Sequence, residues 1–220
     1  MLESLLSIPN FCWSGEAFET EGDAVPARAR RSTPLTGRFA YASPAEDGSV
    51  TLARDRLGLN KLFLAIHESG TVVAGNYLFD LVRHGVPFEA IYSVPGGYEV
   101  RIAKDGSSLG VSRYGDARNR WGVMTSSPDD VARDIRSELD LWLSRLAAQF
   151  GDRKVCICLS GGLDSGLIAV LARQYFSNLT AYTYTFMAPG TLVSEDAMYA
   201  EGLARSLGIP FRLGPATAEE

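Results

Sequence analysis

The sequence predicts an α/β protein: a front part of short antiparallel strands, followed by parallel βαβ units of a doubly wound sheet. Three observations support this prediction. Between residues 37 and 106, short apolar segments alternate with glycine-containing turns, which is typical of antiparallel sheet. From residue 154 onward, strand patterns alternate with helix patterns, which indicates parallel strands joined by crossover helices. A long amphipathic helix is predicted between the two parts.

The composition is that of an ordinary globular protein. The 220 residues are 46% hydrophobic and 21% charged, so enough apolar surface exists to bury a core. The net charge of -5 gives no general attraction to nucleic acid or to an anionic membrane, and neither is expected as a partner. No apolar run reaches the roughly 18 residues needed to span a bilayer, and the first residues lack a basic segment. A cytoplasmic location is therefore expected.

The front part is predicted to contain several strands and one short helix. Residues 1–36 are expected to be irregular. Their basic cluster is either a solvated loop or a phosphate-binding patch, and it comprises Arg28, Arg30 and Arg31. The predicted strands cover residues 37–42, 49–54, 62–67, 71–75 and 98–102, and the helix covers residues 78–84.

A polar stretch at residues 116–127 is predicted to be a linker, and a helix is predicted to follow it. Ser127 suits the N-cap position, and Pro128 suits the first helical position. Apolar residues then recur at helical spacing until Gly151, so the helix has about 20 residues.

The second part is predicted to run strand, helix, strand, helix, strand. The expected ranges are 154–159, 166–175, 180–186, 194–207 and 209–213. Cys156 and Cys158 share one face of the first of these strands. A metal site would need more ligands, and the chain has only two histidines, His67 and His84, for which surface or packing roles are expected. The two cysteines are therefore expected to be small, buried core residues.

The run SGGLDS at residues 160–165 lies where a buried strand passes into a helix. Adjacent glycines let backbone amides converge on one point and let a ligand approach closely. The helix N-terminus adds partial positive charge, and Ser160 and Ser165 add hydroxyl donors. This combination suits an anion, above all a phosphate chain. The loop lacks the Gly-Lys-Ser/Thr ending of a Walker A motif.

Asp164 lies within this loop, where a carboxylate would repel a bare phosphate. Its presence is explained if it holds Mg²⁺ that bridges phosphate oxygens. The alternative is that Asp164 merely caps the helix.

The strand and loop resemble the pyrophosphate loop of the N-type ATP pyrophosphatases, and within them the asparagine synthetase family. Residues 183–186 and 194–200 also fit that family. The resemblance implies cleavage of ATP between the α and β phosphates and adenylation of a carboxylate. It implies that ATP and Mg²⁺ are held by Ser160, Gly161, Gly162, Leu163, Asp164 and Ser165, with Asp164 on the metal. It also implies an adenine wall formed by Cys158, Leu159 and Tyr184.

The front of the chain resembles the same family independently. The stretch ARDRLGLNKLF at residues 53–63 is similar to a segment of class II glutamine amidotransferase domains, and residues 37–42 and 94–98 resemble its neighbours. The resemblance implies a degenerate amidotransferase-like domain with a partial Ntn-type sheet over residues 37–115. It further implies the N-terminal part of an adenine nucleotide hydrolase-like synthetase domain over residues 128–220.

The sequence departs from the family pattern in two places. The family's glutaminase uses an N-terminal cysteine, whereas position 2 here is Leu2 and Cys12 is internal. Segments that hold glutamine are also missing, so glutaminase activity is expected to be absent, as in β-lactam synthetases and lasso-peptide cyclases. The chain stops at Glu220, before the family's second acidic motif. We therefore expect a split or truncated member that a partner chain could complete.

The leading hypothesis is an ATP-dependent, amide-forming protein that acts on a small-molecule or peptide carboxylate. A second hypothesis is a non-catalytic nucleotide-binding subunit completed by a partner. A GMP synthetase or a tRNA-modifying enzyme is a third, and the stretch Arg54 to Gly58 argues against it. Arg54, Asp55 and Arg56 are expected to form a structural set of ion pairs.

Overall fold

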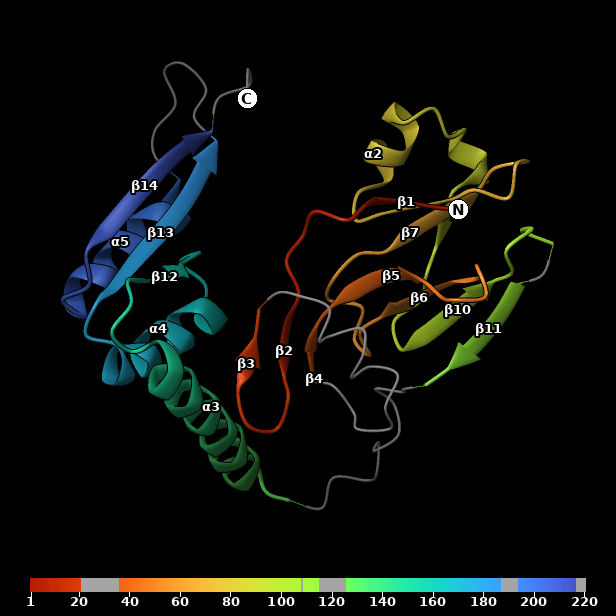
Figure 1. The fold of residues 1–220 in the computed structure, drawn as a ribbon. Helices are drawn as coiled ribbons and strands as arrows, with labels where there is room; N and C mark the ends of the chain where they lie inside the picture. Colours follow the sequence, from red (N-terminus) through yellow and green to blue (C-terminus); the bar gives the residue numbers. More distant parts are fainter. Residues whose placement is uncertain (21–35, 108, 115–125, 187–193, 217–220) are drawn as a thin grey trace. The chain divides into compact units, whose positions relative to one another are not determined.

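The computed structural model describes residues 1–20, 36–107, 109–114, 126–186 and 194–216 (Figure 1). It is a mixed α/β protein with parallel and antiparallel sheets, which confirms the predicted fold class at this level. The chain divides into two compact units, Met1–Val123 and Met124–Glu220. The basic cluster at Arg28, Arg30 and Arg31 and residues 116–125 of the predicted linker lie outside the described residues. No described helix is long and apolar enough to cross a membrane.

Among the residues that the structure describes, the first unit contains two four-stranded sheets and one three-stranded sheet. The first sheet has the order β1 (Leu2–Leu5), β8 (Val72–Gly75), β7 (Phe63–Ile66), β9 (Tyr92–Ser93). The second has the order β11 (Leu109–Arg113), β10 (Tyr98–Ile102), β6 (Val50–Arg54), β5 (Ala40–Pro44). The third has the order β3 (Phe18–Glu19), β2 (Phe11–Trp13), β4 (Thr36–Arg38).

The two four-stranded sheets share one hydrophobic core. Leu52 of β6 and Ile102 of β10 are buried in the same cluster as Leu64 of β7. The opposite face of the first sheet is covered by α2 (Leu78–Arg83), whose Leu81 packs with Ala65 and is fully buried. A short 3-10 helix, η1 (Phe88–Ala90), follows. Alternation along β7 thus places Leu64 in one core and Ala65 in the other.

The prediction that residues 1–36 are irregular is wrong for residues 1–20, which contain β1, β2 and β3. β1 also pairs parallel to β8, with Leu2 opposite Val72, although only antiparallel pairing was predicted for this part. These strands are very short, and the partner of β1 lies far along the chain. Local sequence patterns therefore carry little information about them.

The stretch around Arg54 and Asp55 is structural, as predicted, but the predicted set of ion pairs is wrong. The Asp55 carboxylate is fully buried and accepts hydrogen bonds from four backbone amides, at 2.8 to 3.3 Å. The donors belong to Phe39, Leu57, Leu59 and Asn60. The guanidinium of Arg54 donates to the backbone carbonyls of Gly58, Asn60 and Val94. Both charged groups therefore fix the backbone of the turn through bonds to main-chain atoms.

The second unit follows the predicted order of helices and strands. Its elements are α3 (Pro128–Phe150), β12 (Val155–Cys158), α4 (Leu163–Tyr175), β13 (Leu179–Phe186), α5 (Glu195–Ser206) and β14 (Phe211–Ala216). The strands pair in the order β12, β13, β14, and all the pairs are parallel. Ser127 caps α3 as predicted: its side chain accepts from the Asp130 amide, and the Asp130 carboxylate accepts from the Ser127 amide.

Apolar side chains from the three helices form one core against the sheet of the second unit. Leu143 of α3, Ala169 of α4 and Ala200 of α5 are buried in the same cluster as Ala181 of β13. Figure 1 shows α5 against the paired strands β13 and β14. The helices therefore fix the sheet and hold its carboxyl ends in place.

We expect Asp55→Asn to lower the free energy of unfolding of the first unit by about 2–4 kcal/mol. Each Asp55 oxygen accepts from two amides, so an Asn side chain places its NH₂ group against two donors. Urea denaturation monitored by circular dichroism measures the change.

Asp105→Asn is the matched control for Asp55→Asn, because one oxygen of exposed Asp105 accepts both bonds from Ser107, and Asn retains that oxygen. For Asp105→Asn we expect the free energy of unfolding to change by no more than about 0.5 kcal/mol. Equal effects of the two substitutions would contradict the structural role of Asp55.

Candidate functional site

The SGGLDS loop begins where β12 ends, at the carboxyl edge of the parallel sheet. Cys158 is the last residue of β12 and pairs with Tyr182 of β13. Leu159 continues in contact with β13, since its amide donates to the Tyr182 carbonyl at 2.8 Å. Its carbonyl accepts from the Thr183 hydroxyl at 2.5 Å. These bonds fix the direction in which the chain leaves the sheet.

The two serines of the loop lie together. The Ser160 and Ser165 hydroxyl oxygens are 2.9 Å apart, and the Ser160 amide donates to the Ser165 oxygen at 3.1 Å. The Gly162 amide lies 3.4 Å from the Ser160 oxygen, to which it donates. The loop is thereby closed into a small ring of hydroxyl and amide groups that bond to one another, and an anion would engage these donors in place of the bonds within the ring.

Helix α4 starts directly after this ring, and its N-cap residue is Gly162, which has no side chain to cap the helix. The alternative role for Asp164, that of a capping residue, is therefore not what the structure shows. Asp164 lies exposed in the first turn of α4. The uncapped first turn presents a positive dipole end to the loop.

Gly161 is the point at which the loop touches α5. Its φ is +76°, and a Cβ atom there would lie 2.3 Å from the main-chain oxygen of Asp196. No other residue type fits this conformation and this space together. The backbone path of the loop is therefore fixed by its contact with the first turn of α5.

A pocket of about 270 Å³ lies beside the loop. Five of the predicted residues line it, namely Cys158, Leu159, Ser160, Ser165 and Tyr184. Gly161, Gly162, Leu163 and Asp164 are not among its lining residues. Leu163 is 92% exposed, and because its side chain is apolar it can offer a phosphate only its backbone amide.

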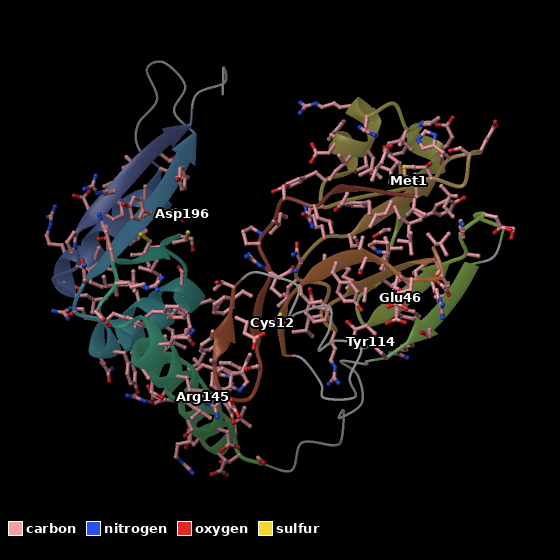
Figure 2. All side chains as sticks on the ribbon, in the orientation of Figure 1. Met1, Cys12, Glu46, Tyr114, Arg145 and Asp196 are labelled. Carbon is pink, nitrogen blue, oxygen red and sulfur yellow. The ribbon has the colours of Figure 1, made fainter. Side chains whose placement is uncertain are left out.

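Sequence reasoning missed four residues that line the same pocket: Tyr182, Thr183, Ser194 and Asp196. Two of them come from the start of α5, where Ser194 is the N-cap and accepts from the Ala197 amide at 3.3 Å. Because parallel strands end at one edge of a sheet, the loops after β12 and β13 meet there. That rule could have found both Ser194 and Asp196; Figure 2 labels Asp196.

The carboxylates beside the loop suit a magnesium ion that is held mainly by phosphate. Asp164 stands on the first turn of α4, and Asp196 lines the pocket from α5. In the part of the chain that the structure describes, no three His, Cys, Asp or Glu residues cluster as a metal site. Mg²⁺ needs no such cage, because it commonly uses one or two carboxylates, substrate phosphates and water.

The prediction that Cys156 and Cys158 are buried is wrong. Both are exposed on one face of β12, whereas Val155 and Ile157 face the helices. Cys12, labelled in Figure 2, is fully buried with Phe39 in the first unit. Burial and the nearby charge of Asp55 raise the pKa of the Cys12 thiol to about 12, which makes it a poor nucleophile at neutral pH.

Comparison with known proteins confirms the resemblance to the asparagine synthetase family. Residues 144–219 match the family model for asparagine synthase. The glutamine-hydrolyzing asparagine synthetase of Bos taurus is 28% identical over 191 residues, which cover 79% of this chain and 34% of that protein. The glutamine-hydrolyzing GMP synthase of Ligilactobacillus salivarius is 25% identical over 174 residues, which cover 70% of this chain and 30% of that protein.

Among solved structures, the glutamine-dependent NAD+ synthetase of Acinetobacter baumannii in complex with ADP matches with a TM-score of 0.33 and 18% identity. The match covers 59% of this chain and 23% of that one. The chain spans about a third of the length of the curated asparagine synthetases that it matches.

We expect Gly161→Ala to destabilise the second unit by about 2–4 kcal/mol, because a methyl group meets the Asp196 carbonyl and the left-handed φ is unfavourable for alanine. Gly202→Ala is the matched control, since Gly202 lies within α5 and nothing surrounds its added Cβ within 4 Å. Gly202→Ala should stabilise the second unit by about 0.5–1 kcal/mol. Hydrogen exchange of the amides of β12 and α4 measures both, and an unchanged Gly161→Ala protein would refute the close contact.

We expect iodoacetamide to label Cys156 and Cys158 in the folded protein at pH 8 and to leave Cys12 unlabelled until the chain is unfolded. The first two thiols are exposed, whereas Cys12 is buried and its raised pKa keeps it protonated. Peptide mass mapping before and after addition of denaturant shows which thiols react. Rapid labelling of Cys12 in the native protein would contradict its core position.

Proposed function

We propose that the second unit binds Mg-ATP and takes part in ATP-dependent formation of an amide bond, with activation of a carboxylate as its adenylate. The similarity to glutamine-hydrolyzing asparagine synthetases supports a ligase of this general type. The single observation that carries the proposal is the loop at residues 160–165, whose serines and amides converge beside a pocket at the carboxyl edge of the sheet.

The proposed binding mode follows from the donors that the loop presents. Ser160, Gly161, Gly162, Leu163 and Ser165 would hold the pyrophosphate portion of ATP through their amides and through the two hydroxyls. Asp164, on the first turn of α4, would hold Mg²⁺ on the phosphate oxygens, and Asp196, which lines the pocket, would offer a second carboxylate. Cys158, Leu159 and Tyr184 would form the wall beside the base.

The proposed reaction has two steps. A carboxylate oxygen of the substrate attacks the α-phosphorus of ATP, the bond to the β-phosphate bridge oxygen breaks, and pyrophosphate leaves with the electron pair. An amine then attacks the acyl carbon and loses a proton to solvent, the bond from that carbon to the phosphate oxygen breaks, and an amide forms as AMP leaves with the electron pair. Charge that builds on the leaving pyrophosphate would be stabilised by the loop donors and by Mg²⁺.

We propose a small-molecule or peptide carboxylate as the substrate and a partner chain that completes the site. Glutamine hydrolysis is not part of the proposed activity. The buried Cys12 is packed in a core and has a raised pKa, so it does not suit nucleophilic attack on an amide. The amine would accordingly come from the substrate itself or from a separate donor.

We expect calorimetry to show saturable binding of Mg-ATP to the 220-residue chain and at least about tenfold weaker binding by Asp164→Asn. Without magnesium, the same substitution should leave ATP binding unchanged or slightly stronger, because it removes a charge that repels phosphate. Asp152→Asn is the control, since Asp152 is an exposed carboxylate in the turn after α3 and should change neither affinity.

Exchange of pyrophosphate into ATP, with candidate carboxylic acids present, tests the chemical step. Exchange that depends on an acid supports adenylation. Saturable Mg-ATP binding without exchange for any acid would favour the non-catalytic nucleotide-binding subunit. Absence of ATP binding by a folded chain would overturn the proposal.

A further inference from the structure

The side of β13 that faces the helices changes from apolar to polar along its length. Leu179 and Ala181 are buried in the apolar core of the second unit. The next two residues on that side, Thr183 and Thr185, are also buried, at 6% and 8% exposure, but they carry hydroxyl groups. A hydroxyl group is costly to bury unless it is hydrogen-bonded. Both hydroxyls have partners, and neither partner belongs to β13.

Thr183 holds the residue at which the chain enters the loop. Its hydroxyl donates to the Leu159 carbonyl at 2.5 Å. The Leu159 amide donates to the Tyr182 carbonyl at 2.8 Å, so both main-chain polar groups of Leu159 are bonded to β13. The next residue is Ser160, whose amide and hydroxyl both lie within hydrogen-bonding distance of the Ser165 hydroxyl. The pair of loop serines therefore begins directly after the residue that Thr183 holds.

Thr185 holds the opposite wall of the pocket. Its hydroxyl donates to the Ser194 oxygen at 3.3 Å. Ser194 is the N-cap of α5, and its oxygen also accepts from the Ala197 amide at 3.3 Å. The main-chain oxygen of Asp196 lies in the space that a Cβ atom at Gly161 would need. The end of β13 is therefore bonded both to the start of the loop and to the start of the helix that the loop touches.

We propose that Thr183 and Thr185 are positioning residues for the phosphate site, whose hydroxyls hold the loop at residues 160–165 in the form that binds an anion. The proposal rests on the proposed function, since it takes this loop to hold the phosphates. An incoming anion replaces the hydrogen bonds within the loop, so those bonds cannot keep the loop in shape once the ligand is bound. The two bonds from β13 lie outside this exchange. They keep the backbone ordered before binding and thereby raise the affinity.

The test uses calorimetry on the full chain, with magnesium tripolyphosphate and Mg-ATP as the ligands. Valine keeps the shape of threonine and removes the hydroxyl, so Thr183→Val leaves the Leu159 carbonyl without its donor. This variant should bind both ligands roughly 3- to 30-fold more weakly, with the stoichiometry of the parent chain. Thr185→Val should weaken both about 2- to 5-fold, because its lost bond is longer. Thr183→Ser restores the donor and should bind within about 2-fold of the parent.

Thr180→Val is the matched control, since Thr180 is a threonine of the same strand that is equally buried, at 5% exposure, and lies outside the lining of the pocket. It should leave both affinities unchanged. Circular dichroism establishes that each variant is folded. Should Thr183→Val be unfolded, Thr183→Ala takes its place with the same expected weakening, because position 183 borders the pocket and water can then reach the Leu159 carbonyl.

The stoichiometry distinguishes positioning from a purely structural role. A structural role would lower the fraction of chains that bind and leave their dissociation constant unchanged, and that result would overturn the proposal. Affinities of Thr183→Val and Thr185→Val equal to that of the parent, or an equal loss in Thr180→Val, would overturn it as well while leaving the phosphate site intact. Failure of the parent chain to bind either ligand would instead overturn the proposed function.

Discussion

The backbone at Gly161 passes so close to the first turn of α5 that no side chain fits between them. The contact joins two segments that lie far apart in the sequence, the loop after β12 and the helix after β13. It depends on the parallel register of the two strands, which brings their carboxyl ends to one edge. It also depends on Ser194, which fixes where α5 begins. The position of Asp196 beside the loop, and with it the part of the pocket wall that α5 supplies, follows from this one approach.

The first unit is organised by buried polar groups as much as by its apolar core. Asn60 and Asn76 are almost completely buried, and an amide hydrogen bond links their side chains. The Asn76 oxygen accepts from the amides of Ser7 and Ile8 at 2.7 and 2.8 Å. These bonds anchor the segment after β1, and Asp55 does the same for the turn after β6. Such groups are costly to bury unless all of them are bonded, so they specify one arrangement of the strands.

Features encoded by neighbouring residues were predictable from the sequence. The start of α3 follows from Ser127, Pro128 and Asp130, and the order of strands and helices in the second unit follows from periodicity. The meeting of Ser160 and Ser165 follows from a strand that turns into a helix through glycines. In each case the determining interaction spans only a few residues.

Features that depend on distant contacts were not predictable in this way. The sequence does not predict β1 because the strand that pairs with it lies some 70 positions away, at Val72. Cys156 and Cys158 look like core residues on an apolar strand, and their exposure depends on which sheet face the helices cover. Asp55 and Arg54 look like an ion pair because sequence shows charges but does not show which backbone groups surround them. Ser194 and Asp196 join the pocket only through the topology of the sheet.

The glycine at the start of α4 has a thermodynamic consequence. A helix whose N-cap offers no side chain leaves its first amides to be satisfied by something else. An anion that binds there supplies the missing cap, so ligand occupancy and formation of the helix become one linked equilibrium. The second unit would then grow more stable with the logarithm of ligand concentration. A substitution of Gly162 by a residue whose side chain caps the helix would stabilise the second unit without ligand. Ligand binding would then add less to its stability.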